Sequence, residues 1–476
     1  MTDTTTFIAT GDHLTLEKAE KDTQTALKFI TCGSVDDGKS TLIGRLLVDS
    51  KAVLQDHLAG VQRQGETDLA LLTDGLSAER EQGITIDVAF RYFATEDRKF
   101  IIGDAPGHEQ YTRNMVTAAS SADAGVVLVD ATKLAWALQP GAATPSQDEG
   151  HGLLAQTRRH TLLVHLLRVP SIVFAVNKLD AVPDAAHTFA RIRDALQAFA
   201  LHAGIAVSAI VPISALKGWN VVQAADEPVA WCGYNGPTLL QILEKLPGAV
   251  AESGEPLAFP VQWVERFSSS ADTSQGRRVF WGRVATGALQ AGAVVQVFPS
   301  GQTATIAQVL DHVRRPGSVN AGHSAGVILD RELDVSRGDW LLLAPGAADA
   351  ASPGQAIDHD DFDTPAAAPA VWPATRELLA TVAWMDDEPL IAGRVYWALH
   401  AHRWVKARVK RVVHRLDIHT LAEHAATQLE PNAIGHVELL LQEPVPAAPY
   451  RRSRVLGSMI LVDTATHKTA GAVLVN

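Results

Sequence analysis

The stretch that decides the fold is a glycine-rich run near the start of the chain, Gly33-Ser34-Val35-Asp36-Asp37-Gly38-Lys39-Ser40, followed by Thr41. It matches the pattern GxxxxGK(S/T), in which backbone amides surround phosphate groups and the lysine reaches their oxygens. A β-prone segment at 26–32 precedes the run, and helical spacing follows it to residue 47. We therefore predict a strand, a phosphate-binding loop and a helix, with Lys39 on the β- and γ-phosphates and the Ser40 hydroxyl on magnesium.

The alternation of strand and helix continues to about residue 250. Strands are expected at 99–103, 124–129, 171–176 and 207–213, and helices at 111–119, 156–167, 188–201 and 238–246. Strands that alternate with helices predict a parallel sheet covered on both faces. We expect one α/β domain over 26–250, after an N-terminal tail of residues 1–25.

A second motif, Asp104-Ala105-Pro106-Gly107-His108, follows the expected strand at 99–103. Because parallel strands end at the same edge of a sheet, Asp104 should lie beside the phosphate loop and hold a magnesium-bound water. The amide of Gly107 should then reach the γ-phosphate. His108 is placed to orient the attacking water, although it could instead be a surface histidine that caps the next helix.

Between these two motifs lies the segment Gly83-Ile84-Thr85-Ile86-Asp87. Thr85 can bring its hydroxyl to magnesium and its amide to the γ-phosphate. Such a segment is ordered by a nucleoside triphosphate and released after hydrolysis. We therefore expect Thr85 to be a third magnesium ligand beside Ser40 and Asp104.

Two further motifs predict guanine as the base. Asn177-Lys178-Leu179-Asp180 follows the strand at 171–176, and the Asp180 carboxylate can accept from N1–H and the exocyclic amino group of guanine. Adenine does not offer this pair of donors, so a polar pocket of this kind discriminates strongly. Ser214-Ala215-Leu216 follows the strand at 207–213, in position for a backbone contact to guanine O6. Together the motifs predict a GTP site in an α/β P-loop GTPase domain.

The sequence pattern changes near residue 256, where short β-prone runs separated by glycine and proline replace the alternation of strands and helices. This pattern predicts two β-barrels, at 256–344 and 375–476, joined by an Ala-, Pro- and Asp-rich linker at 345–374. Within the first domain, residues 132–151 are an expected surface insertion, because about twenty loop-like residues stand where a handful is usual.

Composition excludes several classes of protein. The 476 residues include 41 basic and 53 acidic side chains, a net charge of −12, which argues against non-specific nucleic-acid binding and against an anionic membrane surface. Two cysteines far apart in the sequence, Cys32 and Cys232, predict neither a disulfide framework nor a zinc site. The chain has no signal-peptide pattern and no long apolar window, so we expect a cytoplasmic protein.

Three other patterns in the sequence suggest different functions. Gly322-His323-Ser324-Ala325-Gly326 matches the GxSxG of hydrolases, but its flanks predict β structure and loop rather than a strand-to-helix turn. A late group of histidines lacks carboxylate or cysteine partners at ligand spacing, so we expect solvated strand and loop residues; they are His400, His402, His414, His419 and His424. The basic stretch 403–415 alternates apolar and basic residues, which predicts an exposed strand, with a partner- or RNA-facing surface as the alternative.

With these residues laid out, the chain closely resembles the translational GTPase superfamily, whose members carry a G domain and two β-barrels. Within that superfamily, the runs 33–47, 73–87, 98–118 and 156–160 look like the GTP-binding subunits of bacterial sulfate adenylyltransferase. The resemblance is dense over residues 26–246 and mostly architectural across the two barrels.

This resemblance implies that GTP hydrolysis is coupled to a reaction on a smaller catalytic subunit that binds ATP and sulfate. The products would be adenosine 5′-phosphosulfate and diphosphate, in the first step of sulfate assimilation, with GTP and Mg²⁺ as cofactors. Some relatives carry a fused adenylylsulfate kinase with its own GxxxxGK(S/T); no second such run occurs here, so kinase activity is not expected. Neither a membrane nor a nucleic acid is expected as a partner.

One residue departs from a plain phosphate loop. Asp36 places a carboxylate near the phosphates, and in related GTPases an aspartate there can help to hold a monovalent cation. Stimulation by K⁺ is therefore a hypothesis.

Two other functions stay open at this point: a translation factor that delivers a tRNA to the ribosome, and a stand-alone GTPase.

Overall fold

A computed structural model of the protein describes residues 26–52, 62–63, 66–67, 69, 88–107, 112–134, 152–225, 231–248, 252–266, 278–346, 371–417 and 422–476. The chain divides into two compact units. One contains the described residues up to 248, and the other contains the described residues from 252 onward.

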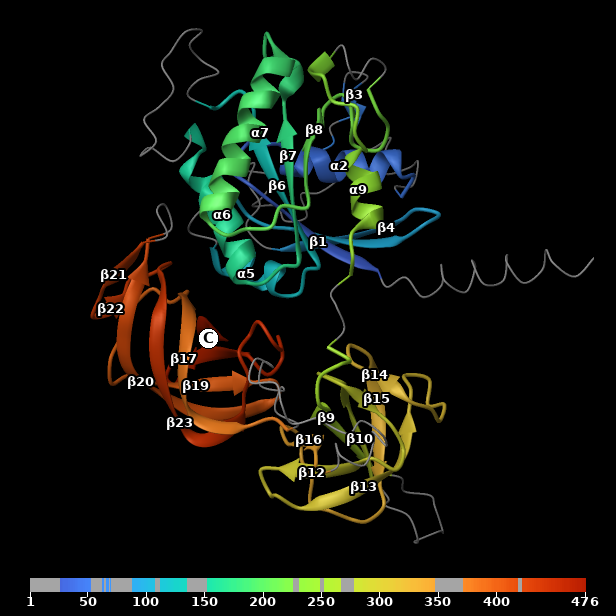
Figure 1. Cartoon of the computed structure of the whole chain (residues 1–476), viewed down its shortest axis with the longest axis vertical. Helices are drawn as coiled ribbons and strands as arrows, with labels where there is room; N and C mark the ends of the chain where they lie inside the picture. Colours follow the sequence, from blue (N-terminus) through green and yellow to red (C-terminus); the bar gives the residue numbers. More distant parts are fainter. Residues whose placement is uncertain are drawn as a thin grey trace, which may run out of the picture. The chain divides into compact units, whose positions relative to one another are not determined.

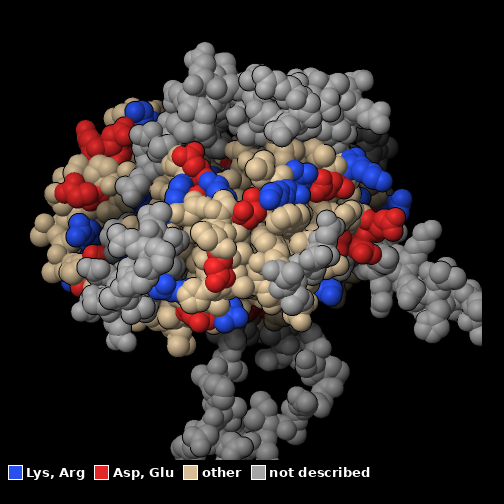
Figure 2. Space-filling view, turned by 90° about the horizontal axis from the view of Figure 1, so that it is seen from above, with Lys and Arg blue, Asp and Glu red and all other residues tan. Residues whose placement is uncertain are grey.

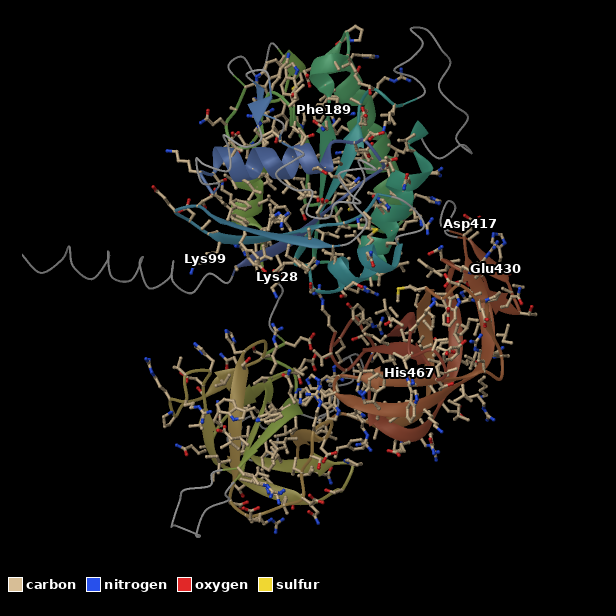
Figure 3. All side chains as sticks on the ribbon, turned by 180° about the vertical axis from the view of Figure 1, so that it is seen from behind. Lys28, Lys99, Phe189, Asp417, Glu430 and His467 are labelled. Atoms are coloured by element: carbon tan, nitrogen blue, oxygen red, sulfur yellow. The ribbon has the colours of Figure 1, made fainter. Side chains whose placement is uncertain are left out.

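The first unit is built on a six-stranded sheet with the order β4-β5-β1-β6-β7-β8 (Figure 1). Its strands are β4 (Ala89–Ala94), β5 (Lys99–Asp104), β1 (Leu27–Cys32), β6 (Ala124–Asp130), β7 (Ser171–Asn177) and β8 (Ala209–Pro212). Five strands run parallel, as predicted, with β1 between β5 and β6. In the side-chain view, Lys28 of β1 and Lys99 of β5 lie near the start of their strands, away from the ends that carry the predicted motifs (Figure 3).

The prediction of an all-parallel sheet was incomplete, because β4 pairs antiparallel with β5. A tight turn joins the two strands, in which the amide of Thr95 donates to the carbonyl oxygen of Arg98 at 2.9 Å. β4 is an edge strand that leaves Phe90 and Tyr92 exposed. A short, half-exposed edge strand lacks the continuous apolar run that identified the buried parallel strands.

The helices of this unit are α2 (Lys39–Asp49), α5 (Thr112–Ser120), α6 (Ala155–Leu166), α7 (Ala185–His202) and α9 (Leu239–Lys245). Apolar side chains of α2 and α9 join one buried cluster with alternate residues of the strands. On the other face, Val164 of α6 packs so closely on Gly125 of β6 that a Cβ there would lie 2.8 Å from Val164 Cγ1. The expected helix at 188–201 begins earlier because Asp184 caps the amide of His187. A small ribbon pairs β2 (Gln62–Arg63) with β3 (Glu66–Thr67).

The second unit begins with a closed barrel of six strands in the order β10-β15-β13-β12-β16-β9. They are β9 (Ala258–Arg266), β10 (Arg278–Arg283), β12 (Val294–Phe298), β13 (Thr303–Leu310), β15 (Ser324–Leu329) and β16 (Trp340–Leu343), and β11 (Ala288–Leu289) pairs with β14 (Val319–Asn320) outside the barrel. The predicted barrel is confirmed. Ser324 begins a barrel strand rather than a strand-to-helix turn, so the GxSxG match is not a nucleophile elbow.

The C-terminal part forms a seven-stranded sheet with the order β19-β24-β25-β17-β23-β20-β21. An additional pairing of β19 with β20 joins all of these strands except β21 into a ring, which agrees with the second predicted barrel. The elements are β17 (Ala374–Trp384), β18 (Leu390–Ile391), β19 (Val395–His400), β20 (Arg403–Leu416), β21 (Glu423–Ala425), β22 (Gln428–Leu429), β23 (Ile434–Pro446), β24 (Ser458–Asp463) and β25 (Thr469–Val475).

Aromatic side chains connect the two β-structures of this unit. The rings of Trp340 and His400 stack with centroids 5.2 Å apart, and the indole of Trp372 donates to the carbonyl oxygen of Pro256 at 2.9 Å. The end of the expected linker at 345–374 is therefore packed. His400 is fully buried, and burial lowers its pKa to about 4, so the prediction that the late histidines are solvated was wrong for this residue.

The basic stretch 403–415 lies in β20, whose lysines and arginines alternate with buried apolar residues, as an exposed strand predicts. Acidic neighbours pair with it: Arg403 with Glu443 at 2.6 Å, and Arg411 with Glu438. On the face of the molecule seen from above in Figure 2, which does not identify β20, basic and acidic side chains are also interspersed. The ion pairs of Arg403 and Arg411 offset the positive charge of β20 and weaken the interpretation of this strand as an RNA-facing surface.

Among the helices within the described ranges, none is long and apolar enough to span a bilayer.

Candidate functional site: a phosphate-binding loop

The predicted phosphate loop lies between β1 and α2, as the sequence pattern requires. Gly33 and Gly38 have φ angles of 149° and 93°, which side chains rarely adopt. A Cβ on Gly38 would lie 2.5 Å from Nδ2 of Asn177, and one on Gly33 would lie 2.8 Å from the carbonyl oxygen of Leu128. Both glycines are therefore needed for the loop to pass so close to its neighbours.

Asp37 shapes the inside of the loop. Its side chain is fully buried, and its Oδ2 accepts a hydrogen bond from the amide of Ser34 at 2.6 Å. Burial raises the pKa of this carboxyl group, while Lys133 and Lys39 oppose the rise; Nζ of Lys133 is 3.4 Å from Oδ1. Asp37 thus stabilises the turn of the loop from within, whereas the side chain of Asp36 is exposed.

Lys39 lies in the position expected of the phosphate-binding lysine. Its ammonium group donates to the carbonyl oxygens of Ser34 at 2.8 Å and of Gly33 at 3.3 Å. Burial lowers its pKa, and the charges of Asp104 and Asp37 counter that effect. A Cβ on Gly107 would lie 2.7 Å from Nζ, so the motif that ends β5 faces the same space as the lysine.

Asp104 is the last residue of β5 and pairs in register with Thr31 of β1. Its Oδ1 accepts a hydrogen bond from Oγ1 of Thr31 at 3.2 Å. The parallel pairing of β1 with β5 therefore brings Asp104, Ala105, Pro106 and Gly107 to the edge of the sheet where the phosphate loop begins. Ser40 and Thr41 follow Lys39 in the first turn of α2.

The side chain of Asn177 connects the predicted base motifs to the phosphate loop. Its Nδ2 donates to the carbonyl oxygen of Asp37 at 2.8 Å, and its Oδ1 accepts from the amide of Ala215 at 3.0 Å. Arg45 of α2 holds the same segment through the carbonyl oxygens of Ala215, at 3.2 Å, and Leu216. Three segments far apart in the sequence thus meet at one amide side chain.

Lys178 and Asp180 follow Asn177 at this corner. Lys178 has a φ of 62°, and its ammonium group donates to the carbonyl oxygen of Asp36 at 2.6 Å. The same group lies 2.8 Å from Oδ2 of Asp130. Asp180 lies in a short 3₁₀ helix, Leu179–Ala181, and is half-buried. Lys178 therefore supports the loop, while Asp180 as a residue is partly exposed.

The first residues of the expected insertion belong to this network. Thr132 donates to Oδ1 of Asp130 through its amide at 2.9 Å and its hydroxyl at 2.6 Å. Burial opposes the ionisation of Asp130, but the hydrogen bonds from Lys178 and Thr132 outweigh it and hold its pKa below the usual range. Lys133 donates to the carbonyl oxygen of Val35. The part of the insertion at 135–151 lies outside the described residues.

Two residues of α6 that the motifs did not identify also contact the loop. Nδ1 of the buried His160 accepts from the amide of Gly33 at 3.1 Å. Oε1 of Gln156 accepts from the hydroxyl of Ser34 at 2.9 Å, and its Nε2 donates to the carbonyl oxygen of Gly107. The run 156–160 carried part of the family resemblance, and that likeness was the signal that could have found them.

Two predicted site residues, Thr85 and His108, lie outside the described residues. Their roles stay predictions. The structure brings the other predicted residues of the phosphate loop, the Asp104 motif, the Asn177 motif and the Ser214 motif to one edge of the sheet.

This fold and loop define a P-loop GTPase of the elongation-factor type. Residues 24–248 match the family model described as "Elongation factor Tu GTP binding domain". Residues 377–476 match a second model, "GTP-eEF1A C-terminal domain-like". The first match supports GTP as the nucleotide.

Relatives that match almost the whole chain show which family within this class of GTPases it belongs to. Sulfate adenylyltransferase subunit 1 of Laribacter hongkongensis is 38% identical over 480 residues, covering 99% of this chain and 89% of that protein. The subunit 1 of Citrobacter koseri is 40% identical over 459 residues, covering 94% of this chain and 86% of the relative. A bifunctional enzyme CysN/CysC of Xylella fastidiosa is 43% identical over 454 residues, 94% of this chain but 65% of the relative. The chain belongs to the sulfate adenylyltransferase subunit 1 family, which favours that function over the translation-factor alternative.

Proposed function

We propose that this chain is the GTPase subunit of a sulfate adenylyltransferase. It couples GTP hydrolysis to the formation of adenosine 5′-phosphosulfate and diphosphate from ATP and sulfate. The observation that carries the proposal is the bridge that Asn177 makes between Asp37 and Ala215, because it ties a phosphate loop to a base-binding segment in a chain with full-length relatives of this family. Formation of the phosphosulfate anhydride has a strongly unfavourable free energy, which gives a reason to consume a second nucleotide.

In this proposal, the amides of residues 33–41 and the ammonium group of Lys39 bind the phosphates of GTP. Ser40, Asp104 and Thr85 offer hydroxyl and carboxylate oxygens, the donors that Mg²⁺ prefers. The bound ion would neutralise charge on the phosphate oxygens. The burial of Lys39 and the approach of Gly107 to the same ammonium group support a phosphate position beside these two residues.

The base is read at the opposite end of the loop. We assign the guanine contacts to Asp180 and to the backbone of residues 214–216, with Asn177 and Lys178 holding these segments in place. Hydrolysis uses His108 to orient the attacking water, while the amide of Gly107 contacts the γ-phosphate. The half-buried position of Asp180, close in sequence to the buried Asn177, supports this division of roles.

The relatives' name, subunit 1, implies a partner subunit. We propose that this partner is the smaller catalytic subunit, which binds ATP and sulfate. We also propose domain limits at 26–250, 256–344 and 375–476, and a cytoplasmic location. Two buried cysteines without a disulfide suit a reducing compartment.

The test mixes the chain with a candidate small subunit, ATP and sulfate, and measures diphosphate release with and without GTP. We expect release to depend on GTP and to fall to the level without GTP in Lys39→Ala. No GTP-dependent release with a partner that is active alone would overturn the coupling. Stimulation of GTP hydrolysis by ribosomes would favour the translation-factor alternative instead.

Potassium stimulation is proposed separately for Asp36. Its exposed side chain and left-handed backbone, with φ of 62°, lie at the turn of the phosphate loop. GTPase rates measured in equal concentrations of Na⁺ and K⁺ test it. Equal rates in the two salts would contradict a K⁺ site, and Asp36→Ala should remove any difference.

A further inference from the structure

Three side chains from three strands of the C-terminal barrel place possible metal ligands within 4.8 Å of one another: His414, Glu423 and His436. Nε2 of His414 lies 3.1 Å from Oε1 of Glu423, and Nδ1 of His436 lies 3.9 Å from the same oxygen. The two imidazole rings meet edge to face with centroids 4.3 Å apart. Both histidines are half-buried, while Glu423 is exposed.

Strand pairing explains this arrangement. His414 of β20 lies directly opposite His436 of β23, and on its other side it pairs with Ala425 of β21. Glu423 is two residues before Ala425, which puts it diagonally across from His414 on the same face of the sheet. The late histidines have no carboxylate partner at ligand spacing in the sequence, yet the fold brings Glu423 to His414, because cross-strand partners have no fixed spacing in the sequence.

The geometry of the contact between His414 and Glu423 resembles that of two ligands of one metal ion more closely than that of a hydrogen bond. Nε2 of His414 is buried and makes no hydrogen bond within the described part of the chain, although the carboxylate oxygen is so near. Ligand atoms about 2.0–2.2 Å from a tetrahedral Zn²⁺ are about 3.3 Å apart. The observed 3.1 Å fits that separation, and rotation of the exposed Glu423 side chain would shorten the 3.9 Å distance.

The chemistry of the donors also suits a metal. Two imidazole nitrogens and one carboxylate oxygen are a usual set for Zn²⁺ and related divalent ions, with water completing the coordination.

We propose that His414, Glu423 and His436 bind one divalent transition-metal ion, with Zn²⁺ as the preferred occupant, and that this ion fastens β21 to β20 and β23. β21 is a three-residue strand at the edge of the sheet, so it has few backbone contacts of its own. A single ion shared by three strands would hold it in register.

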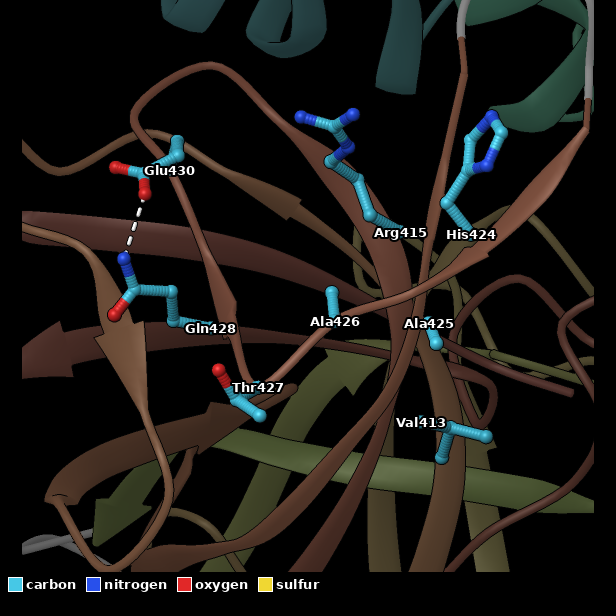
Figure 4. A pocket seen from close by; sticks show the side chains of 8 residues that line it. All are labelled: Val413, Arg415, His424, Ala425, Ala426, Thr427, Gln428 and Glu430. Carbon is cyan, nitrogen blue, oxygen red and sulfur yellow. Dashed lines mark hydrogen bonds between the residues drawn. The ribbon is translucent and has the colours of Figure 1, made fainter.

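The site also fixes the wall of a pocket. Arg415 and His424 are the neighbours of His414 and Glu423 in sequence, so their side chains leave the opposite face of the ribbon. They pair in register and line a pocket of about 540 Å³ together with residues 425–428 and Glu430 (Figure 4). In that pocket, Nε2 of Gln428 donates to Oε1 of Glu430 at 2.7 Å. Binding of the ion would therefore order both faces of the ribbon.

The test uses the full chain, freed of metals with a chelator and saturated with GTP and Mg²⁺ so that the phosphate loop is occupied. Co²⁺ is the probe, because its visible absorption reports a low-coordinate nitrogen and oxygen site. We expect one equivalent of Co²⁺ per chain to give this absorption, and Zn²⁺ to displace it. His414→Gln and His436→Gln should each weaken binding at least about tenfold.

The matched control is His467→Gln, which changes an exposed histidine in another turn of the same barrel (Figure 3). It should bind Co²⁺ as the unaltered chain does. A circular dichroism spectrum and a thermal unfolding curve like those of the unaltered chain, without metal, show that each variant is folded. Glu423→Gln supplies a surface substitution if a histidine variant is not folded. Absence of the absorption in the unaltered chain, or equal binding by the His414→Gln/His436→Gln double variant, would overturn the proposal.

Discussion

The backbone amide of Gly33 donates a hydrogen bond to Nδ1 of His160, 3.1 Å away, across the 127 residues that separate them in the sequence. Gly33 is the first residue of the phosphate loop, and His160 is a buried residue of α6. Because Nδ1 accepts, the ring carries its proton on Nε2 and must be neutral. The hydrogen bond at the start of the phosphate loop therefore requires the neutral form of the His160 side chain.

This relationship predicts a pH dependence of stability. Burial, with Lys39 and Arg159 nearby, lowers the pKa of His160 from 6.5 to about 3. The unfolded chain binds this proton below pH 6.5 and the folded chain does not, so the contribution of His160 is complete above 6.5 and is lost as the pH falls toward 3. The loss should approach about 1.4 kcal/mol per pH unit within that window.

His160→Asn isolates this contribution, since the amide oxygen can accept from Gly33 and cannot be protonated. Urea unfolding of the G domain at several pH values should show a shallower decline below pH 6.5 for the variant than for the unaltered chain. His187→Asn, which changes an exposed histidine of α7, should leave the slope as it is. Identical slopes for His160→Asn and the unaltered chain would contradict the prediction.

A second prediction concerns Gln156, which contacts both Ser34 of the phosphate loop and Gly107 of the predicted γ-phosphate segment. Gln156→Ala removes two hydrogen bonds that hold these segments together. At about 0.5–1.5 kcal/mol each, their loss should weaken GTP binding roughly tenfold, measured with a fluorescent GTP analogue.

Gln156→Glu separates the two contacts, because it keeps an acceptor for the Ser34 hydroxyl and loses the donor to Gly107. If the Gly107 contact matters, the glutamate variant should bind GTP more weakly than the unaltered chain while GDP binding changes less. Equal losses for GTP and GDP would mean that Gln156 only supports the loop.

The sequence alone predicted those features of the fold and the site that depend on residues close together in the chain. The spacing of Gly33, Gly38 and Lys39 predicted the strand, loop and helix, and the buried apolar runs predicted the five parallel strands. It was insufficient where partners meet only in the fold. Nothing in the spacing of His160 connects it to Gly33, and the pairing of His414 with Glu423 follows from the register of β20 and β21. The edge strand β4 was missed because its exposed face breaks the apolar pattern.

A third prediction tests catalysis at His108. If this side chain orients the attacking water, His108→Ala should slow GTP hydrolysis by about 10² to 10⁴ and leave GTP affinity nearly unchanged. Single-turnover hydrolysis and equilibrium binding measure the two effects. A loss of affinity comparable to the loss of rate would show that His108 has a structural role instead.

The last prediction separates base recognition from support of the loop. Asn177 bonds to Asp37 and Ala215 in the interior, so Asn177→Ala leaves a buried carbonyl oxygen and a buried amide unpaired, at a cost of about 1–3 kcal/mol each. We expect it to lower the stability of the G domain and to weaken GTP and xanthosine triphosphate alike.

Asp180→Asn should behave differently. The half-buried Asp180 carboxylate is expected to accept from the N1–H and the amino group of guanine, whereas an asparagine amide can donate to the oxygen that xanthine carries in place of that amino group. GTP binding should therefore weaken while xanthosine triphosphate binding strengthens, measured by competition against one labelled nucleotide. Parallel losses for both nucleotides, as expected for Asn177→Ala, would assign Asp180 to the scaffold and remove it from base selection.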